Sequence, residues 1–235
     1  MADSPRPGAE PGVVGPPLPG AVLLVAHDPD PGAGAVRPEL MELLGSDRCA
    51  ALERALIVRA ARWAADVAPG RVHVAYEPAG AADALRELAG KGARLFPARG
   101  ASVPERLAGA VARAWSEAGD GPLLVAWPDL PRWRAEHAGS ALEDLADGCG
   151  VSVGPVFDGG FYLLALARPV PSLFELPADA WSSPDAMGLA LAAVHHAGLV
   201  VGLLRAERGL RRAADVRAAL ADPLLDPELR SILEG

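Results

Sequence analysis

Short apolar runs alternate with alanine-rich segments of helical period along most of the chain. The apolar runs have the length of strands and lie at residues 21–26, 72–76, 93–96, 123–126, 151–156, 161–166 and 199–204. The segments of helical period lie at residues 47–68, 79–91, 104–118, 135–146, 184–197 and 213–221. Strands that alternate with helices predict an α/β fold, in which a mostly parallel sheet carries helices on both faces.

The two ends of the chain depart from this alternation. Residues 1–20 are rich in proline and glycine and predict a flexible tail without the apolar segment of a signal peptide. Residues 222–235 carry Pro223 and Pro227 and predict a short appended helix. Residues 21–221 are therefore expected to form a single domain, because their number suits one α/β unit.

The composition narrows the class of protein. Apolar residues make up 51% of the chain and charged residues 22%, so a sizeable core can be buried. The net charge of −8 argues against general binding of nucleic acid, because such proteins usually carry a basic surface. No apolar stretch approaches the roughly 18 residues of a membrane-spanning helix. Cys49 and Cys149 have neither metal nor disulfide spacing, and a cytoplasmic location is expected.

Ligands of open α/β sheets bind in the loops at the carboxyl ends of the strands, and the loop at residues 27–37 is the first of these. Its glycines let backbone amides approach a phosphate, which Arg37 can bind through two hydrogen bonds. The loop is neither a Walker loop nor a G-x-G-x-x-G turn, so an ordinary turn is the alternative. Its candidate binding residues are His27, Pro29, Gly32, Gly34 and Arg37.

Two aspartates follow later strands. Asp129 comes shortly after the apolar run 123–126 and is expected to face the cleft, or else to cap the next turn. Asp158 precedes Gly159 and Gly160, which predict an open floor for a sugar or phosphate while Asp158 accepts a hydroxyl proton. The alternative interpretation of this segment is a hairpin turn of the Asp-Gly type.

Two further segments lie just before or at the start of helices. Trp181 can line the cleft, while Ser182 or Ser183 can cap the helix that follows. Glu105 and Arg106 lie in the first turn of a helix that proline opens. The chain holds no G-x-S-x-G elbow, so hydrolases of that type are disfavoured.

Several segments match a known pattern in the same order. The strongest is at residues 154–163, where G-P-V-F-D-G-G-F-Y-L is similar to G-P-A-x-D-G-G-Y-Y-L. Weaker matches lie at 29–32 with Arg37 (P-V-P-G and K-T-R-L), 104–107 (G-E-R-M), 128–131 (S-P-D-L-P), 171–174 (P-x-L-F) and 181–183 (W-S-T). Over residues 21–220 the chain thus resembles the glycosyltransferase-A-like transferases of arsenosugar biosynthesis, also described as radical-SAM- or selenodomain-associated.

This resemblance implies the glycosyltransferase-A fold of the nucleotide-diphospho-sugar transferase superfamily, a three-layer sandwich around a mostly parallel sheet. It also implies a reaction that moves a sugar from a nucleotide-sugar to a small acceptor. The substrates are then a nucleotide-sugar and a small molecule, with no nucleic acid or membrane as partner. Pattern alone does not distinguish a dimer surface from a core face, so a homodimer stays open.

The matching segments lack the acids with which this fold commonly binds a metal. Ala126 and Trp127 stand where the family has the aspartate and serine of G-S-D-S-P, and Gly209 and Arg211 replace the leading acids of Y-D-V-D-T-P. Carboxylates are the usual ligands of a divalent ion that neutralises a leaving diphosphate. No metal or other cofactor is therefore expected, and fixed charge from Arg211 and Arg212 is expected in its place.

The resemblance distributes roles among the candidates. Asp158 and Asp129 are the candidate catalytic acids. The nucleotide is expected to contact His27, Pro29, Gly32, Gly34, Arg37, Arg211 and Arg212, and the sugar or acceptor to contact Gly159, Gly160, Trp181, Ser182, Ser183, Glu105 and Arg106. One alternative is a catalytically silent paralogue that binds or scaffolds, because the metal acids are missing. Another is a nucleotidyltransferase related to the molybdenum-cofactor guanylyltransferases, although the first loop has no lysine.

Overall fold

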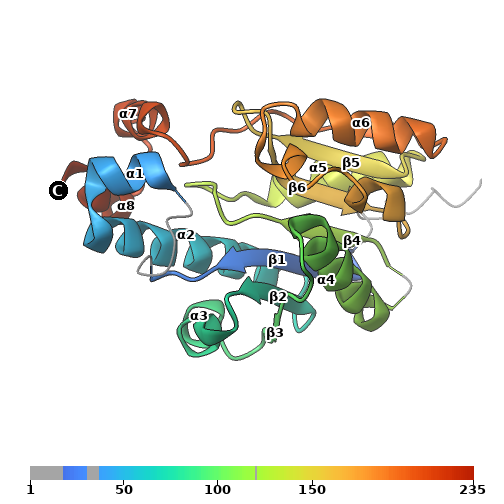
Figure 1. Ribbon diagram of the computed structural model, residues 1–235, viewed down its shortest axis with the longest axis horizontal. Coiled ribbons are helices and arrows are strands. Elements are labelled where there is room, and N and C mark those ends of the chain that lie inside the picture. Colours follow the sequence, from blue (N-terminus) through green and yellow to red (C-terminus); the bar gives the residue numbers. More distant parts are fainter. Residues whose placement is uncertain (1–17, 31–36, 120) are drawn as a thin grey trace, which may run out of the picture.

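A seven-stranded sheet forms the centre of the protein. The computed structural model describes residues 18–30, 37–119 and 121–235 (Figure 1). The sheet has the order β3-β2-β1-β4-β6-β5-β7. Its strands are β1 (Ala21–His27), β2 (Val72–Glu77), β3 (Arg94–Pro97), β4 (Leu123–Ala126), β5 (Val151–Pro155), β6 (Phe161–Leu166) and β7 (Val201–Leu203). All seven predicted strands are confirmed, with ends that differ by a few residues.

One strand of the described sheet runs against the others. β6 pairs antiparallel with both β4 and β5, whereas the remaining pairs are parallel. β5 and β6 are joined by a short hairpin, so their connection lies at the same edge as the carboxyl ends of β1 and β4. The mostly parallel sheet was expected, and the hairpin is what brings Asp158 to the ligand-binding edge.

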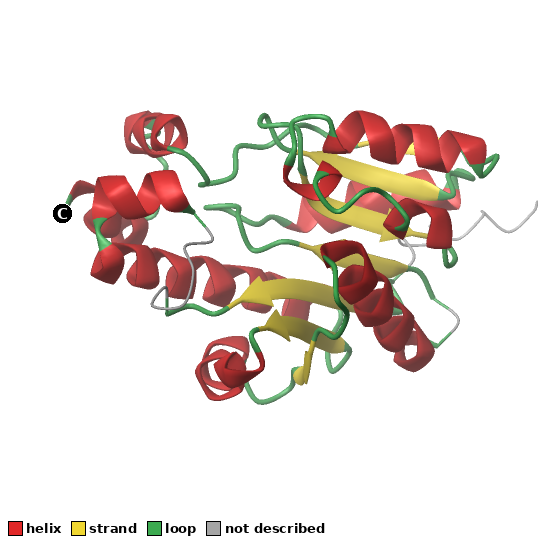
Figure 2. Ribbon diagram, viewed as in Figure 1, coloured by secondary structure: helices red, strands yellow, loops and turns green. Residues whose placement is uncertain are grey.

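The helices cover both faces of the sheet (Figures 1 and 2). They are α1 (Pro38–Leu44), α2 (Ser46–Val67), α3 (Ala82–Ala89), α4 (Val103–Ala118), α5 (Ala135–Ala146), α6 (Ala186–His196), α7 (Ala213–Ala221) and α8 (Pro227–Glu234), with short 3₁₀ turns η2 (Ala79–Ala81), η3 (Pro171–Phe174) and η4 (Ala180–Ser182). α1 is missing from the prediction because its seven residues are too few to show a helical period. Among the helices of the described chain, none is long and apolar enough to cross a membrane.

Two apolar clusters separate the sheet from its helical layers. One buries Leu107 of α4 and Val194 of α6 against one face, together with Leu123 and Val125 of β4. The other buries residues of α2, α3 and α5 against the opposite face, including Trp63, Leu85 and Leu142. This arrangement confirms the three-layer α/β fold.

A third apolar cluster lies beyond the edge of the sheet. Leu229 and Leu233 of α8 pack there with Leu52 and Leu56 of α2 and with Val216 of α7. The C-terminal segment therefore forms the expected short helix, which lies against α2 at the left of Figure 1.

Candidate functional site

A cleft of about 550 Å³ lies at the carboxyl edge of the sheet, where ligands of open α/β sheets bind. Its walls come from the ends of β1, β2 and β4, from α4, from the β5–β6 hairpin and from the segment before α7. Eight of the predicted site residues line it: His27, Arg37, Arg106, Asp129, Asp158, Trp181, Arg211 and Arg212. The fold thus gathers residues that are spread over more than 180 positions of the sequence.

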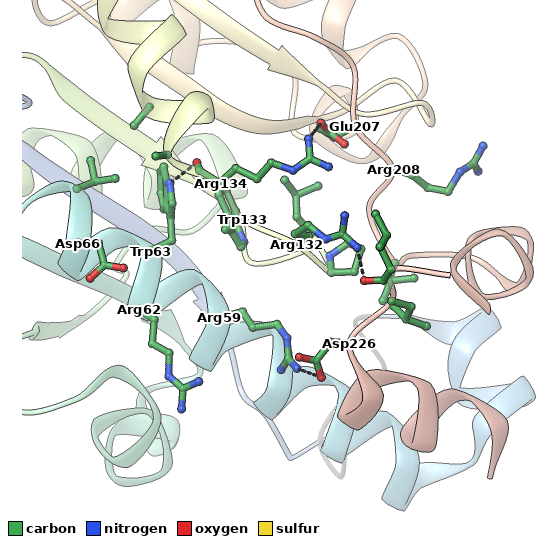
Figure 3. Close-up of a pocket in the computed structure, with 18 of the residues that line it drawn as sticks. Arg59, Arg62, Trp63, Asp66, Arg132, Trp133, Arg134, Glu207, Arg208 and Asp226 are labelled. Carbon is green, nitrogen blue, oxygen red and sulfur yellow. Dashed lines mark hydrogen bonds and ion pairs between the residues drawn. The ribbon is translucent and has the colours of Figure 1, made fainter. Parts of the chain in front are cut away.

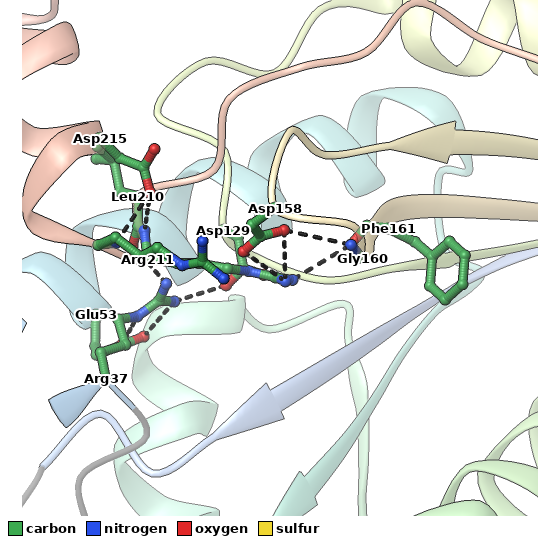
Figure 4. Close-up of polar contacts among 10 residues, drawn as sticks. Arg37, Glu53, Asp129, Asp158, Gly160, Phe161, Leu210, Arg211 and Asp215 are labelled. Carbon is green, nitrogen blue, oxygen red and sulfur yellow. Dashed lines mark hydrogen bonds and ion pairs between the residues drawn. The ribbon is translucent and has the colours of Figure 1, made fainter. Parts of the chain in front are cut away.

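Charges alternate along one wall of this cleft. Five side chains, which we call the arginine–carboxylate chain, follow one another in space as Glu53, Arg37, Asp129, Arg211 and Asp158 (Figure 4). Arg37 forms an ion pair with Glu53 and donates from Nη2 to Asp129 Oδ1 at 2.7 Å. Its Nη1 donates to the carbonyl of Leu210 at 2.6 Å. The Arg37 side chain is only 8% exposed, so it is fixed by these three partners.

Arg211 continues the chain from Asp129 to Asp158. Its Nε donates to Asp129 Oδ2 at 2.7 Å, and its Nη2 forms a second contact with the same oxygen. Its Nη1 lies 3.4 Å from Asp158 Oδ2, and its Nη2 donates to the carbonyl of Phe161 at 3.4 Å. Every nitrogen of this guanidinium therefore has an acceptor within the protein.

The two arginines determine the charge state of Asp129. Burial raises the pKa of this carboxyl, but Arg211 and Arg37 outweigh burial and hold its pKa far below the ordinary range. A carboxylate that is so strongly held in its ionised form is a weak base. This geometry suits Asp129 to positioning the two guanidinium groups, and its predicted catalytic role stays a prediction.

Asp158 lies in the loop between β5 and β6. The backbone N–H groups of Val156 and Gly159 close this loop by donating to the carbonyls of Gly160 and Val156. The segment is thus a hairpin turn, as the plainer interpretation has it, and its carboxylate also lines the cleft. Asp158 Oδ1 accepts from the N–H of Gly160 at 3.3 Å, and its only ion pair among the described residues is the long one with Arg211.

The space beside the two glycines after Asp158 is occupied by other parts of the protein. A Cβ atom on Gly160 would lie 2.8 Å from Arg211 Nη1, and one on Gly159 would collide with the carbonyl of Pro184. The N–H of Met187 donates to the carbonyl of Gly159 at 3.0 Å. In this structure the expected open floor for a ligand is filled by Arg211 on one side and by the segment before α6 on the other.

Replacing Gly159 by alanine should destabilise the protein by roughly 3 kcal/mol, through its φ of +96° and the collision with Pro184. Gly160→Ala is the matched control, because Gly160 has ordinary φ and its new methyl meets side-chain atoms of Arg211 and Val156 and no backbone atom. We expect a loss of about 1 kcal/mol there. Urea unfolding of both variants checks this, and equal losses would contradict the placement of the hairpin against the segment before α6.

The opposite wall of the cleft holds a second group of charges. Glu77, at the end of β2, lies 2.6 Å from Arg106 Nε and 3.4 Å from His27 Nδ1. Arg212 lines the cleft as an exposed side chain and forms no ion pair with a residue that the structure describes. Arg212 is therefore the cation most available to a bound anion.

Aromatic rings form the end of the cleft nearest α6. The Phe161 ring lies 6.1 Å from both Trp127 and Trp181, and the two tryptophans line the cleft. The indole N–H of Trp181 is buried and has no hydrogen-bond partner within the described part of the chain. The cleft therefore offers a flat aromatic surface to a ligand at this end.

Other predicted residues lie outside the cleft lining. Glu105 accepts hydrogen bonds from the N–H of Ala101 at 2.9 Å and from Ser102 Oγ at 3.2 Å, so it closes the N-terminus of α4. Ser183 Oγ accepts from the N–H of Asp185, as the capping interpretation has it. The remaining ones are Pro29, which is buried, Ser182 in η4, and Gly32 and Gly34, which fall outside the described residues.

Three charged residues that line the cleft are absent from the predictions: Glu39, which is exposed on α1, Glu53 and Glu77. Glu53 is buried on α2, beside the apolar face that Leu52 and Leu56 form, where an acid signals a buried partner. Glu77 ends a strand, so the rule that placed Asp129 at the carboxyl edge could also have found it.

The donor set of the cleft does not fit a divalent metal ion. Within the described residues, no three side chains of His, Cys, Asp or Glu are placed to hold one. The two aspartates that face the cleft, Asp129 and Asp158, share Arg211 as their cation. Ala126, which the resemblance aligns with a metal-binding acid, is fully buried in β4.

A larger cavity, of about 1030 Å³, lies on the other side of the loop after β4 (Figure 3). Some arginines of its wall have internal partners: Arg59 lies 2.7 Å from Asp226, and Arg132 donates to the carbonyl of Leu224. Arg62 is exposed there and forms no ion pair with a described residue. Trp63 and Trp133 stack on each other there with ring centroids 4.3 Å apart. The cleft at the carboxyl edge is the stronger candidate, because it lies where this fold binds ligands and holds eight of the predicted site residues.

Comparisons with known proteins agree with the fold. The family model described as "Uncharacterized protein conserved in bacteria (DUF2064)" matches residues 43–183. A structure from Desulfovibrio desulfuricans G20, provisionally named a nucleotide-diphospho-sugar transferase, has a TM-score of 0.77 and 22% sequence identity over 92% of this chain and 95% of that one. The structure of a 4-diphosphocytidyl-2C-methyl-D-erythritol synthase has a TM-score of 0.52 and 13% identity, covering 84% of this chain and 96% of that one. None of the curated proteins matches the sequence.

These likenesses confirm the fold of the nucleotide-diphospho-sugar transferases. At sequence identities of 22% and 13%, these structures support the fold of this chain and do not identify its activity. The finer resemblance to the transferases of arsenosugar biosynthesis stays a prediction.

Proposed function

The chain belongs to the DUF2064 family, and we propose that it binds a nucleotide-sugar in the cleft and transfers the sugar to a small acceptor without a divalent metal. The arginine–carboxylate chain carries this proposal. It places two fixed guanidinium groups and one accessible carboxylate at the edge of the sheet where this fold offers a ligand site. The name of the structure from Desulfovibrio desulfuricans supports the choice of a nucleotide-sugar.

The nucleotide is held on the side of the cleft where β1 ends. Arg212 is exposed there and forms no ion pair with a residue that the structure describes. Its guanidinium therefore pairs with the diphosphate. Arg37 and Arg211 are already paired with carboxylates, so Arg212 carries the contact with the diphosphate. The aromatic wall of Trp127 and Trp181 then faces the sugar or the acceptor.

The transfer needs a base and a stabilised leaving group. Asp158 takes the proton of the acceptor hydroxyl, and the acceptor oxygen forms a bond to the anomeric carbon of the sugar. The bond from that carbon to the diphosphate breaks, and its electron pair leaves with the nucleoside diphosphate beside Arg212. Asp158 suits the first role because its ion pair with Arg211 is the longest in the arginine–carboxylate chain.

One observation favours a second candidate function. Arg211 contacts both Asp129 and Asp158, so each candidate catalytic acid of the cleft is paired with a cation. A protein that only binds a ligand or a partner needs no free base. The alternative is therefore a catalytically silent binding protein on the same fold.

Calorimetric titration with UDP-, GDP- and ADP-linked sugars, in chelator and in Mn²⁺, tests the proposal. We expect at least one of them to bind equally in both buffers. Arg212→Ala should weaken that binding roughly tenfold, which is the loss of one charge-assisted hydrogen bond. Arg217→Ala is the matched control, because Arg217 is exposed on the neighbouring α7 and does not line the cleft.

Two results would contradict this assignment. Binding that requires Mn²⁺ would remove the metal-free part of the proposal. Failure of all three nucleotide-sugars to bind in either buffer would remove the donor site itself and leave the silent alternative.

A further inference from the structure

The Arg211 guanidinium lies between two carboxylates that come from different parts of the sheet. Asp129 follows β4 and Asp158 belongs to the β5–β6 hairpin, and Arg211 contacts both of them (Figure 4). We propose that Arg211 is the built-in cation of this site and keeps divalent ions out of the Asp129–Asp158 pair. The role of Arg211 in a reaction rests on the proposed function. The exclusion of divalent ions does not, because it can be tested without a substrate.

The surroundings of Arg211 are shaped to admit its guanidinium. Gly160 has no side chain at the point where a Cβ atom would come within 2.8 Å of Arg211 Nη1. Gly209 leaves similar space at Asp129, since a Cβ there would lie 3.3 Å from the Cβ of the aspartate. Both glycines thus belong to the arrangement that lets the guanidinium reach the carboxylates.

The backbone of Arg211 is anchored on both sides. The N–H of Leu210 donates to the carbonyl of Asp129 at 2.9 Å. Asp215 Oδ2 accepts from the N–H groups of Arg211 and Arg212 at 3.2 and 2.9 Å. These hydrogen bonds fix the backbone of Arg211. Its positive charge is therefore held in place before a ligand binds, as the charge of a bound metal ion would be.

The balance of charge explains why a metal ion is excluded. The arginine–carboxylate chain holds three carboxylates and two guanidinium groups. A divalent ion could reach Asp129 and Asp158 only by displacing Arg211, and the displaced guanidinium would lose all its acceptors while partly buried.

Removing Arg211 should therefore create a metal site. Asp129 Oδ2 and Asp158 Oδ2 would then have no cation, while Asp129 Oδ1 stays with Arg37 and Asp158 Oδ1 stays with the N–H of Gly160. Hard carboxylate oxygens are the ligands that Mg²⁺ and Mn²⁺ prefer. A divalent ion is therefore expected to bind at the Asp129–Asp158 pair in the variant and not in the wild type.

Electron paramagnetic resonance of free Mn²⁺ measures this directly. We expect no binding at the Asp129–Asp158 pair in the wild type, and binding to Arg211→Ala with a dissociation constant of roughly 10⁻⁴–10⁻³ M, as for sites with few carboxylates. Arg211→Met, which keeps the volume and loses the charge, should behave like Arg211→Ala and covers the case in which the alanine variant does not fold. Adding Asp158→Asn should abolish the new site, and methylguanidinium should compete with Mn²⁺ for it.

Two matched variants locate the effect. Arg211→Lys keeps a positive charge and should stay free of Mn²⁺, as should Arg212→Ala, which leaves Arg211 in place. The inference is overturned if the wild type binds Mn²⁺ in a manner that Asp158→Asn abolishes, or if folded Arg211→Met binds none. Because Mn²⁺ is the only ligand, this outcome is independent of whether nucleotide-sugars bind.

Discussion

Replacing Asp129 by asparagine is expected to lower the free energy of unfolding by about 3–5 kcal/mol, the cost of removing one partner of a buried ion pair. The Asp129 side chain is 12% exposed, and among the described residues it is the one carboxylate that contacts both Arg37 and Arg211. Asparagine keeps the size of the side chain, so the loss reports charge and not packing. The melting temperature should fall by roughly 10 °C for a chain of this length.

The same variant should change how stability depends on pH. Burial raises the pKa of Asp129, but Arg211 and Arg37 outweigh it, so the folded-state pKa lies below the unfolded value near 4. The stabilisation is therefore complete above the unfolded pKa and is lost as the pH falls below about 4 toward the folded pKa. Asp129→Asn should lack this part of the acid-induced loss.

Urea unfolding between pH 3 and pH 7 measures both effects. Asp66→Asn serves as the control, because Asp66 is exposed and forms no ion pair with a described residue. We expect that control to follow the wild type at every pH. An Asp129→Asn protein that matches Asp66→Asn in stability would mean that the arginine–carboxylate chain is not assembled as the structure shows it.

The fold could be predicted from the sequence because its signals are local. Each strand is a short apolar run, and α5 and α7 begin and end at the predicted residues. Such periodicity reflects which side chains face a core, and a few neighbouring residues are enough to show it. The sequence did not predict α1, because its seven residues are too few to show a helical period.

The site could be predicted only in part, because its contacts join distant residues. The rule that ligands bind at the carboxyl ends of strands placed Arg37, Asp129 and Asp158 at one edge. Their partners could not be read from spacing: Arg37 and Arg211 lie 92 and 82 positions from Asp129. Arg211, which is expected to contact the nucleotide as fixed positive charge, forms ion pairs with two carboxylates in the structure. This pairing depends on side-chain geometry alone.

The glycines of the hairpin show the same limit. Their sequence, D-G-G, indicates a turn and the freedom to approach a ligand equally well. The structure shows that Pro184 and Arg211 occupy the space beside Gly159 and Gly160. A glycine thus reveals that something comes close, and only the fold reveals that here it is the protein itself.

Replacing Asp158 by asparagine should reduce sugar transfer by about 10²- to 10⁴-fold, the usual contribution of a general base. Asparagine can still accept hydrogen bonds from Arg211 and from the N–H of Gly160, so the hairpin and the donor affinity should be retained. The amide cannot take a proton from an acceptor hydroxyl at neutral pH. The effect should therefore appear in the rate and not in the calorimetric binding of the donor.

Release of nucleoside diphosphate, with water as the acceptor, provides the measurement before the natural acceptor is identified. Asp179→Asn is a suitable control, because Asp179 is exposed and does not line the cleft. A fully active Asp158→Asn protein would remove Asp158 from the reaction. Donor binding without release in either protein would favour the silent alternative, because Arg211 would then hold Asp158 as a structural partner. Loss of release in Asp158→Asn alone would show that the acid is free to act despite its long ion pair.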